Sequence, residues 1–261
     1  MEYEYRHIRV EKPEPGIVVM SFIRPEKLNS WTDEVIDDMA DFFSRLRFDR
    51  ETSVVILRGE GQKGFSAGID AKNVFRPEVS RDTVKLYDLQ VKLGEIVINM
   101  RKCPQIIITQ AFGSTVGGGM ILAMASDIRL IADNVKFSLP FLKIGMGGAD
   151  LGSSYFLARQ VGQSVAFDMI LTARYMYAEE AMRLGFASQC VAPEELDEAG
   201  MEKARQIAAM DPVLVGFTKE ALNQSLDANC LEHAIMLEHR NQQMGGKHKI
   251  LSAIAAQASK E

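Results

Sequence analysis

The 261-residue chain has little cysteine and none of the cysteine and histidine patterns that hold metals. Its three cysteines, Cys103, Cys190 and Cys230, are an odd number without metal-ligand spacing. This excludes a disulfide framework, predicts no metal site, and is typical of a reduced, intracellular protein. The charged N-terminus also lacks the apolar segment of a signal peptide, so we expect a cytoplasmic protein.

Basic clusters and long apolar stretches are missing as well. The sequence has 30 Lys and Arg and 35 Asp and Glu residues, which gives a net charge of −5. This balance argues against nucleic acid or an anionic membrane as the main partner. The longest apolar stretches, near residues 105–112 and 116–125, are too short or too rich in glycine to span a bilayer. We therefore expect neither a nucleic-acid nor a membrane partner.

What the chain does contain is a recurring order of strand, glycine turn and helix. Residues 5–10 and 16–23 flank a Pro-Gly turn and predict a hairpin. Short β-branched runs at 53–59 and 105–110 predict buried strands, and residues 80–102 have helical periodicity. This order predicts an α/β fold with a mostly parallel sheet. Residues 200–261 are almost entirely helical in pattern.

Two glycine turns are candidates for a ligand site: residues 65–70 and the Gly117-Gly118-Gly119 turn. Each follows a predicted strand, and the second opens a predicted helix. Backbone N–H groups at such turns can form an oxyanion hole. The alternative is that both are only tight turns that pack a helix on a sheet. Neither turn has the GxGxxG or GxxxxGK[ST] pattern, which disfavours NAD and ATP.

Motifs along nearly the whole chain resemble those of the enoyl-CoA hydratase/isomerase family, the crotonase superfamily. They are Arg24–Ser30 (RPEKLNS), Gly64–Asp70 (GFSAGID), Gly117–Gly119, Ala125–Arg129, Lys136–Pro140, Gly152–Leu157, Leu171–Arg174, Ala178–Ala181 and Gly185–Ala187. Each motif is weak by itself, but their order and spacing together are specific.

The resemblance implies a crotonase-like fold of repeated ββα units. Residues 1–199 would form an acyl-CoA-binding core and residues 200–261 a helical trimerisation region. The protein would be a homotrimer or a homohexamer. Its substrate would be an acyl-CoA, with no cofactor beyond the coenzyme A of that substrate.

The resemblance also implies roles for individual residues. In the family, two backbone N–H groups hold the thioester oxygen as an enolate, and the matching positions are Ile69 and Gly118. Residues matching the family's substrate and CoA contacts are Lys27, Leu28, Ala67, Ile69, Asp70, Ala71, Lys72, Gly118 and Phe141.

The chain departs from the family at the two glutamates that a typical hydratase uses. Those positions hold Ile121 and Phe141, and neither can transfer a proton. One carboxylate remains, Asp150, at the position where isomerases of the family keep their acid/base residue. Its glycine-rich, apolar surroundings would raise its pKa toward neutrality. The alternative is that Asp150 caps the helix that follows it.

These features lead to three hypotheses for function. The first is a hydratase/isomerase-family enzyme that forms a thioester enolate, with Asp150 as acid/base. The second is an enoyl- or dienoyl-CoA double-bond isomerase, because one carboxylate can both remove and return a proton. The third is a non-catalytic acyl-CoA-binding scaffold.

Overall fold

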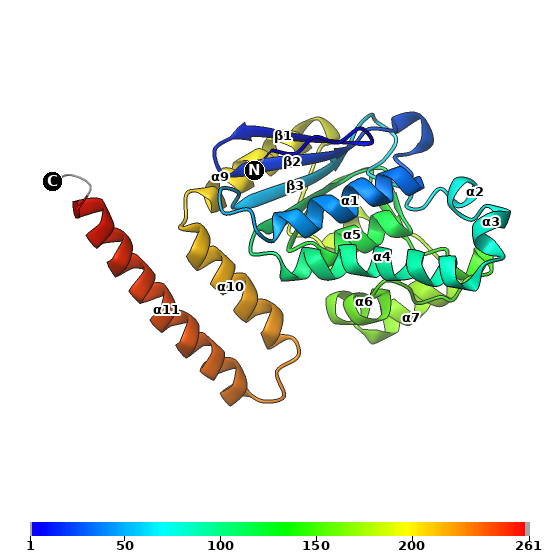
Figure 1. The fold of residues 1–261 in the computed structure, drawn as a ribbon. Helices are drawn as coiled ribbons and strands as arrows, with labels where there is room; N and C mark the ends of the chain where they lie inside the picture. The colour runs from blue at the N-terminus through cyan, green and yellow to red at the C-terminus, as the bar shows by residue number, and fades with distance from the viewer. Residues whose placement is uncertain (1, 259–261) are drawn as a thin grey trace.

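The computed structural model describes residues 2–258 and is built around a six-stranded sheet of order β1-β2-β3-β4-β6-β9 (Figure 1). The strands of this sheet are β1 (Ile8–Glu14), β2 (Ile17–Phe22), β3 (Val54–Gly59), β4 (Ile106–Ala111), β6 (Ile128–Ala132) and β9 (Gln189–Val191). Strands β1 and β2 form the expected antiparallel hairpin, and every other neighbouring pair is parallel. The predicted α/β fold with a mostly parallel sheet is confirmed.

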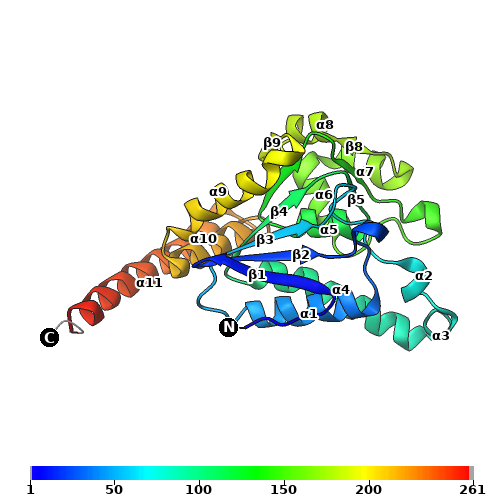
Figure 2. The same cartoon turned by 90° about the horizontal axis from the view of Figure 1, so that it is seen from above.

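Helices cover both faces of this sheet. Helices α1 (Asp33–Leu46) and α4 (Thr83–Lys102) pack together on one face, and α9 (Leu196–Ala208) contacts four central strands on the other (Figures 1 and 2). Every residue of β2 is buried, as expected for a strand covered on both sides. On α1 the apolar stripe Val35, Ile36, Met39, Phe42, Phe43 and Leu46 faces the core.

A second, three-stranded sheet lies beyond the end of β4. It consists of β5 (Ser114–Val116), β7 (Lys136–Ser138) and β8 (Met176–Tyr177). Helix α5 (Gly118–Ala125) starts directly after β5, and all eight of its residues are buried. Around this unit lie α6 (Ser153–Val161), α7 (Gln163–Thr172) and α8 (Ala178–Arg183). The short elements η1 (Pro25–Lys27), α2 (Ala71–Val74), α3 (Pro77–Ser80), η2 (Leu142–Ile144) and η3 (Pro193–Glu195) complete the core.

The C-terminal helices extend away from this core. Helix α10 (Pro212–Ser225) packs beside it, and α11 (Leu231–Ala258) folds back along α10 and projects outward (Figure 1). The expected division between residues 199 and 200 falls inside α9, which packs on the sheet. Within residues 2–258, no helix combines the length and apolar character needed to cross a membrane.

Candidate active site

The two glycine turns lie at one edge of the central sheet. Strands β2, β3 and β4 are parallel and end at Phe22, Gly59 and Ala111. The loops that follow them therefore emerge at the same edge, where open α/β sheets bind ligands. Residues 23–31 and 60–70 belong to these loops, and residues 112–118 lead through β5 to the first residue of α5.

The two turns touch backbone to backbone. A Cβ added to Gly68 would lie 2.4 Å from the amide nitrogen of Gly118, and one added to Gly118 would lie 2.4 Å from the Trp31 ring. A Cβ on Gly119 would lie 2.2 Å from the carbonyl oxygen of Ser66. Gly68 also has φ +76°, a conformation that favours glycine. Glycine is therefore required here by close packing as well as by conformation.

The backbone directions leave two N–H groups available beside this contact. Trp31 bridges residue 69 in parallel: its N–H donates to the Gly68 carbonyl at 2.9 Å, and its carbonyl accepts the Asp70 N–H at 2.8 Å. In a parallel bridge the central residue points its own N–H away from the partner, so the Ile69 N–H faces away from Trp31. Gly118 is the first residue of α5, where the N–H has no intrahelical acceptor. The fold thus brings the regions of Ile69 and Gly118 together.

Asp150 lies on the loop that leads from η2 into α6. Its backbone N–H donates to the Ser153 Oγ at 3.0 Å, and its Oδ1 accepts the Leu151 N–H at 2.9 Å. Leu151 has φ +47°, a rare conformation for a leucine, so this short segment is tightly constrained. On α4, the Gln90 side chain lies near the Asp150 carboxylate and favours its charged form. Asp150 is therefore held between the start of α6 and one face of α4.

The surroundings of Asp150 favour its protonated form. Burial raises the pKa of the Asp150 carboxyl above its ordinary value, and the Leu151 hydrogen bond and the nearby Gln90 amide offset only part of this effect. The alternative in which Asp150 caps α6 is wrong. The N-cap of α6 is Gly152, with φ +85°, and no side chain caps that helix.

The residues at the positions where the resemblance places the family's two glutamates are apolar and buried. Ile121 lies inside α5 with no exposed surface. Phe141 is also buried, and its ring lies 3.8 Å from where a Cβ on Gly117 would be. Phe141 therefore lies against the second glycine turn, which places an apolar wall there.

The residues expected to contact CoA gather around the first glycine turn. The Ala67 N–H donates to the Leu28 carbonyl at 2.9 Å, which holds the two segments together. Lys27, Ala71 and Lys72 are exposed at the surface. Exposed lysines beside a constrained turn are able to meet phosphates as point charges.

Asp70, at the end of the first glycine turn, has a structural role. Its carboxylate accepts a hydrogen bond from the Asn73 amide at 2.7 Å and lies 3.5 Å from the Arg24 guanidinium. Burial alone would raise the pKa of Asp70, but these hydrogen bonds and the Arg24 charge outweigh it and leave the pKa below its ordinary value. Asp70 therefore stays charged and fixes the start of α2.

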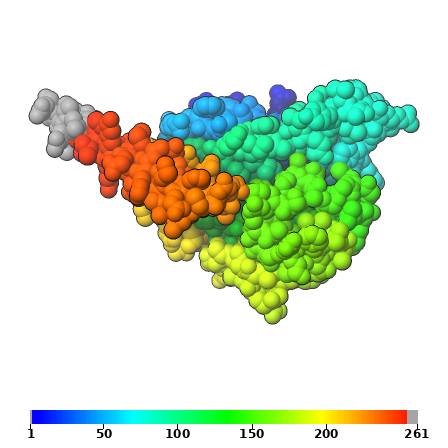
Figure 3. Space-filling view, turned by 90° about the horizontal axis from the view of Figure 1, so that it is seen from below, coloured from blue at the N-terminus to red at the C-terminus, as the bar shows by residue number. Residues whose placement is uncertain are grey.

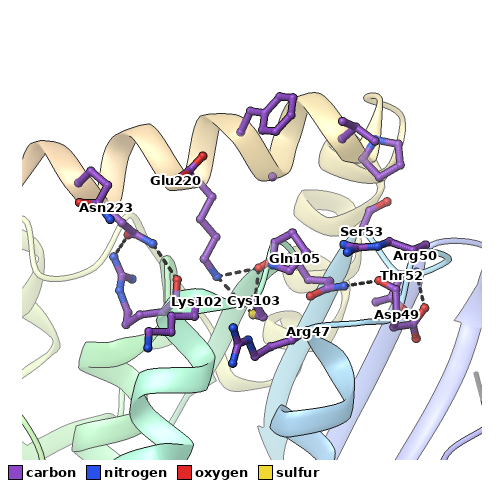
Figure 4. A pocket seen from close by; sticks show the side chains of 18 residues that line it. Arg47, Asp49, Arg50, Thr52, Ser53, Lys102, Cys103, Gln105, Glu220 and Asn223 are labelled. Carbon is purple, nitrogen blue, oxygen red and sulfur yellow. Dashed lines mark hydrogen bonds between the residues drawn. The ribbon is translucent and has the colours of Figure 1, made fainter. Parts of the chain in front are cut away.

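A separate cavity of about 570 Å³ lies at the opposite edge of the sheet, where β3 and β4 begin (Figure 4). Gln105 there donates to the Asp49 carbonyl at 2.7 Å. Lys219, on α10, is buried, donates to the Gln105 carbonyl at 2.7 Å and lies 2.8 Å from Asp127. These contacts tie α10 to the core, far from the glycine turns. Across residues 2–258, no three His, Cys, Asp or Glu side chains gather as a metal site.

The family model described as enoyl-CoA hydratase/isomerase matches residues 12–255. The chain belongs to this family. It is 34% identical over 234 residues to a "Probable enoyl-CoA hydratase echA12" of Mycobacterium bovis, covering 88% of this chain and 82% of that one. It is 33% identical over 223 residues to the (E)-benzylidenesuccinyl-CoA hydratase of Thauera aromatica, covering 85% and 84%.

Solved structures agree with this membership of the enoyl-CoA hydratase/isomerase family. A protein of Streptomyces coelicolor A3(2) assigned as an enoyl-CoA hydratase superposes with a TM-score of 0.88 at 32% identity, over 94% of this chain and 88% of that one. A monofunctional enoyl-CoA isomerase of M. smegmatis gives 0.73 at 31% identity, over 88% and 98%. The expected crotonase-like fold is confirmed.

The structure adds two residues to those found from the sequence. Trp31, which carries no signal in the sequence, covers Gly118. Gln90 meets Asp150 across two elements that are far apart in the chain. The sequence predicts the helix over residues 80–102 that carries Gln90. Nothing in the irregular, glycine-rich loop around Asp150 indicates which face of that helix the loop meets.

Proposed function

We propose that the protein catalyses an enoyl-CoA hydratase/isomerase reaction through a thioester enolate. The observation that carries this proposal is the contact between Gly68 and Gly118, which sets the Ile69 and Gly118 N–H groups at the edge of the sheet. Two such donors stabilise the negative charge that grows on the thioester oxygen in the transition state. Family membership supports an acyl-CoA substrate.

Asp150 is the proposed acid/base. In hydration, its carboxylate takes a proton from water while the water oxygen bonds to the β-carbon. The double-bond electrons move toward the thioester oxygen and form the enolate. The protonated Asp150 then delivers its proton to the α-carbon, which completes the addition of water. A pKa raised by burial suits a group that accepts and returns a proton.

A double-bond isomerase is the second candidate, and the single carboxylate favours it. Asp150 would remove the α-proton of a 3-enoyl-CoA and return it to the γ-carbon, again through the enolate. By the family resemblance, Ile121 and Phe141 stand where a hydratase has its two glutamates, so we expect no second carboxylate at either position. Both a hydratase of Thauera aromatica and an isomerase of M. smegmatis exceed 30% identity to this chain.

The CoA portion would lie along the first glycine turn. Lys27 and Lys72 would meet its phosphates, and Leu28, Ala67, Asp70 and Ala71 would border its path. Phe141 would border the reacting part of the acyl group. No cofactor beyond this CoA is required by the proposed chemistry.

Residues 200–261 form the proposed trimerisation region of a cytoplasmic homotrimer or homohexamer. The support is the apolar surface on α10 and α11, where Leu222, Leu231, Met236 and Ile250 are all more than 60% exposed. Such surface on projecting helices is typical of an interface.

The test is a panel of 2-enoyl- and 3-enoyl-CoA thioesters incubated with the protein and followed by mass spectrometry and NMR. Gain of one water by a 2-enoyl-CoA would establish the hydratase. A moved double bond without change in mass would establish the isomerase. Binding of acyl-CoA with no turnover of any member would contradict both and leave the scaffold.

A further inference from the structure

The cavity of about 570 Å³ at the far edge of the sheet, here called the α10 cavity, has the features of a second ligand site. Three segments that are distant in sequence enclose it: the connection from α1 to β3, the end of α4 with the start of β4, and α10. In the space-filling view the orange part of the chain, where α10 ends and α11 begins, lies next to the blue and blue-green segments that include α1 and α4 (Figure 3). The volume falls within the usual range of small-molecule pockets, roughly 300–1,000 Å³.

A buried acceptor in the lining of this cavity lacks a hydrogen bond. Gln105 is 1% exposed, and its amide nitrogen Nε2 donates to the Asp49 carbonyl at 2.7 Å. Turning this amide over would set two oxygens against each other, which identifies Oε1 as the remaining atom. Within residues 2–258, Gln105 Oε1 has no hydrogen-bond partner. A buried acceptor without a donor is unfavourable, so Oε1 indicates a ligand that brings an N–H or O–H group.

Positive charge is concentrated around the α10 cavity, although the whole chain has a net charge of −5. Five lining residues are basic and two are acidic: Arg47, Arg50, Arg101, Lys102 and Lys219 against Asp49 and Glu220. Helices α1 and α4 end beside this cavity, and each C-terminus contributes only about half a negative charge. An excess of positive charge therefore remains, and it favours an anion.

Two of these cations are available to a ligand. Arg101 and Lys219 share the Asp127 carboxylate, at 3.0 and 2.8 Å. In the part of the chain that the structure describes, no carboxylate pairs with Arg50 or Lys102. Both are exposed, so they lie at the mouth of the cavity. Guanidinium and ammonium groups in such a position bind phosphate, the first by a fork of two N–H groups and the second as a point charge.

α10 adds a flat apolar surface to the lining. Phe217 of this helix and Pro104, just before β4, are both partly buried there. The Phe217 backbone is held by the Asn241 amide, which donates to its carbonyl at 3.0 Å. The helix also approaches Pro104 closely at Gly216, where an added Cβ would lie 2.9 Å from the Pro104 Cβ. An aromatic ring beside a fixed proline suits a planar heterocycle, because nucleobases stack on aromatic side chains.

We propose that the α10 cavity binds a nucleoside monophosphate. Arg50 and Lys102 would hold its phosphate, and an amino group of its base would donate to Gln105 Oε1 while the base lies against Phe217. In Figure 4 Gln105 lies between Lys102 and Arg50, as this arrangement requires. The site lies at the opposite edge of the sheet from the two glycine turns, so it is separate from the path proposed for CoA. A ligand here would also strengthen the attachment of α10, since it would touch all three enclosing segments.

The test is isothermal titration of the full chain with adenosine 5′-monophosphate (AMP) and with inorganic phosphate. We expect the parent to bind AMP about 10-fold or more tightly than phosphate, because only AMP brings a base to stack. The double variant Arg50→Gln, Lys102→Gln should bind AMP about 100-fold more weakly, since each contact to the phosphate contributes about tenfold. Lys27→Gln, Lys72→Gln removes two positive charges beside the first glycine turn and is the matched control. Its affinity for AMP should stay within about twofold of the parent.

The Gln105 contact is tested by a change of ligand. Purine riboside 5′-monophosphate lacks the amino group of AMP, so the parent should bind it about 3- to 10-fold more weakly than AMP. In Gln105→Leu the two ligands should bind equally, because the acceptor for the amino group is gone. Arg50 and Lys102 are exposed, so their variants keep the test valid even where Gln105→Leu does not fold.

The proposal has clear contrary outcomes. Failure of the parent to bind AMP at millimolar concentration would overturn it, as would phosphate binding as tightly as AMP. Loss of AMP binding in Lys27→Gln, Lys72→Gln would place AMP on the path proposed for CoA instead. A preference for AMP that survives in Gln105→Leu would remove Gln105 from the site. The titrations need no turnover, so their outcome is independent of the reaction proposed above.

Discussion

A side chain on Gly68 would place its Cβ 2.4 Å from the amide nitrogen of Gly118. The two residues come from loops after different strands, and only their lack of side chains allows this contact. The N–H groups of Ile69 and Gly118 are positioned by it. The proposed enolate chemistry therefore depends on backbone geometry more than on any side chain other than Asp150.

The first prediction concerns Gly118→Ala. The new Cβ would lie 2.4 Å from the Trp31 ring, so the turn must shift and carry the Gly118 N–H with it. Loss of one oxyanion donor typically lowers kcat about 10²- to 10³-fold. Steady-state kinetics on the enoyl-CoA that the parent turns over would measure this. Gly246→Ala on α11, where a Cβ meets nothing within 4 Å, is the control and should retain full activity. Full activity in Gly118→Ala would remove this amide from the mechanism.

The second prediction concerns Asp150→Asn. Loss of the acid/base group should lower kcat about 10²- to 10⁴-fold. Because burial disfavours the charged form of Asp150, the neutral amide should not lower the melting temperature at neutral pH and is expected to raise it slightly. Asp133→Asn changes an exposed carboxylate and should leave kinetics and melting unchanged. A fall in stability that parallels the fall in activity would indicate a structural role instead.

The third prediction concerns pH. Asp150 acts first as a base, so kcat/KM should rise with pH as its carboxyl ionises. Since its pKa is raised, this rise should occur above the ordinary aspartate value of about 3.9. The nearby Gln90 amide favours the charged form of Asp150, so Gln90→Met should move the rise to higher pH. A pH profile of each variant tests this, and an unchanged or lowered midpoint in Gln90→Met would contradict the assignment.

The fourth prediction concerns the contact between α10 and the core. Lys219 is 3% exposed, lies 2.8 Å from Asp127 and donates to the Met100 carbonyl at 2.9 Å. Lys219→Met would leave the Met100 and Gln105 carbonyls without their buried donor and Asp127 with Arg101 as its remaining cation, which should cost about 1–3 kcal/mol of unfolding free energy. Denaturant unfolding would measure the loss, with the exposed Lys247→Met as the control. Activity of the folded fraction should stay within about twofold of the parent, because Lys219 lies at the opposite edge of the sheet from the two glycine turns.

Much of this architecture follows from local sequence signals. Alternating and β-branched runs predict β1, β2, β3 and β4, and helical spacing predicts α4, because each has one clear pattern of burial. The contact of the two glycine turns could be anticipated only through family resemblance. No periodicity relates residues 65–70 to residues 117–119.

The surroundings of Asp150 were harder to predict. The loop around Asp150 has no regular sequence pattern. The φ of +47° at Leu151 and the position of Gln90 near Asp150 both result from tertiary packing. For the same reason the helix-cap alternative for Asp150 could not be excluded before the structure placed Gly152 at that position. The burial of Lys219 is likewise tertiary, since lysine is normally exposed.

The most direct test of the central claim follows deuterium at the α-carbon of the acyl group. The parent protein and Asp150→Asn would each be incubated with a 2-enoyl-CoA and a 3-enoyl-CoA in deuterated water, and the products analysed by mass spectrometry and NMR. The account predicts that hydration by the parent leaves deuterium at the α-carbon. For isomerisation it predicts a moved double bond, with deuterium at the γ-carbon only to the extent that the protonated Asp150 exchanges with solvent before it returns the proton. Either reaction should nearly vanish in Asp150→Asn. Turnover by Asp150→Asn at the rate of the parent would contradict the account.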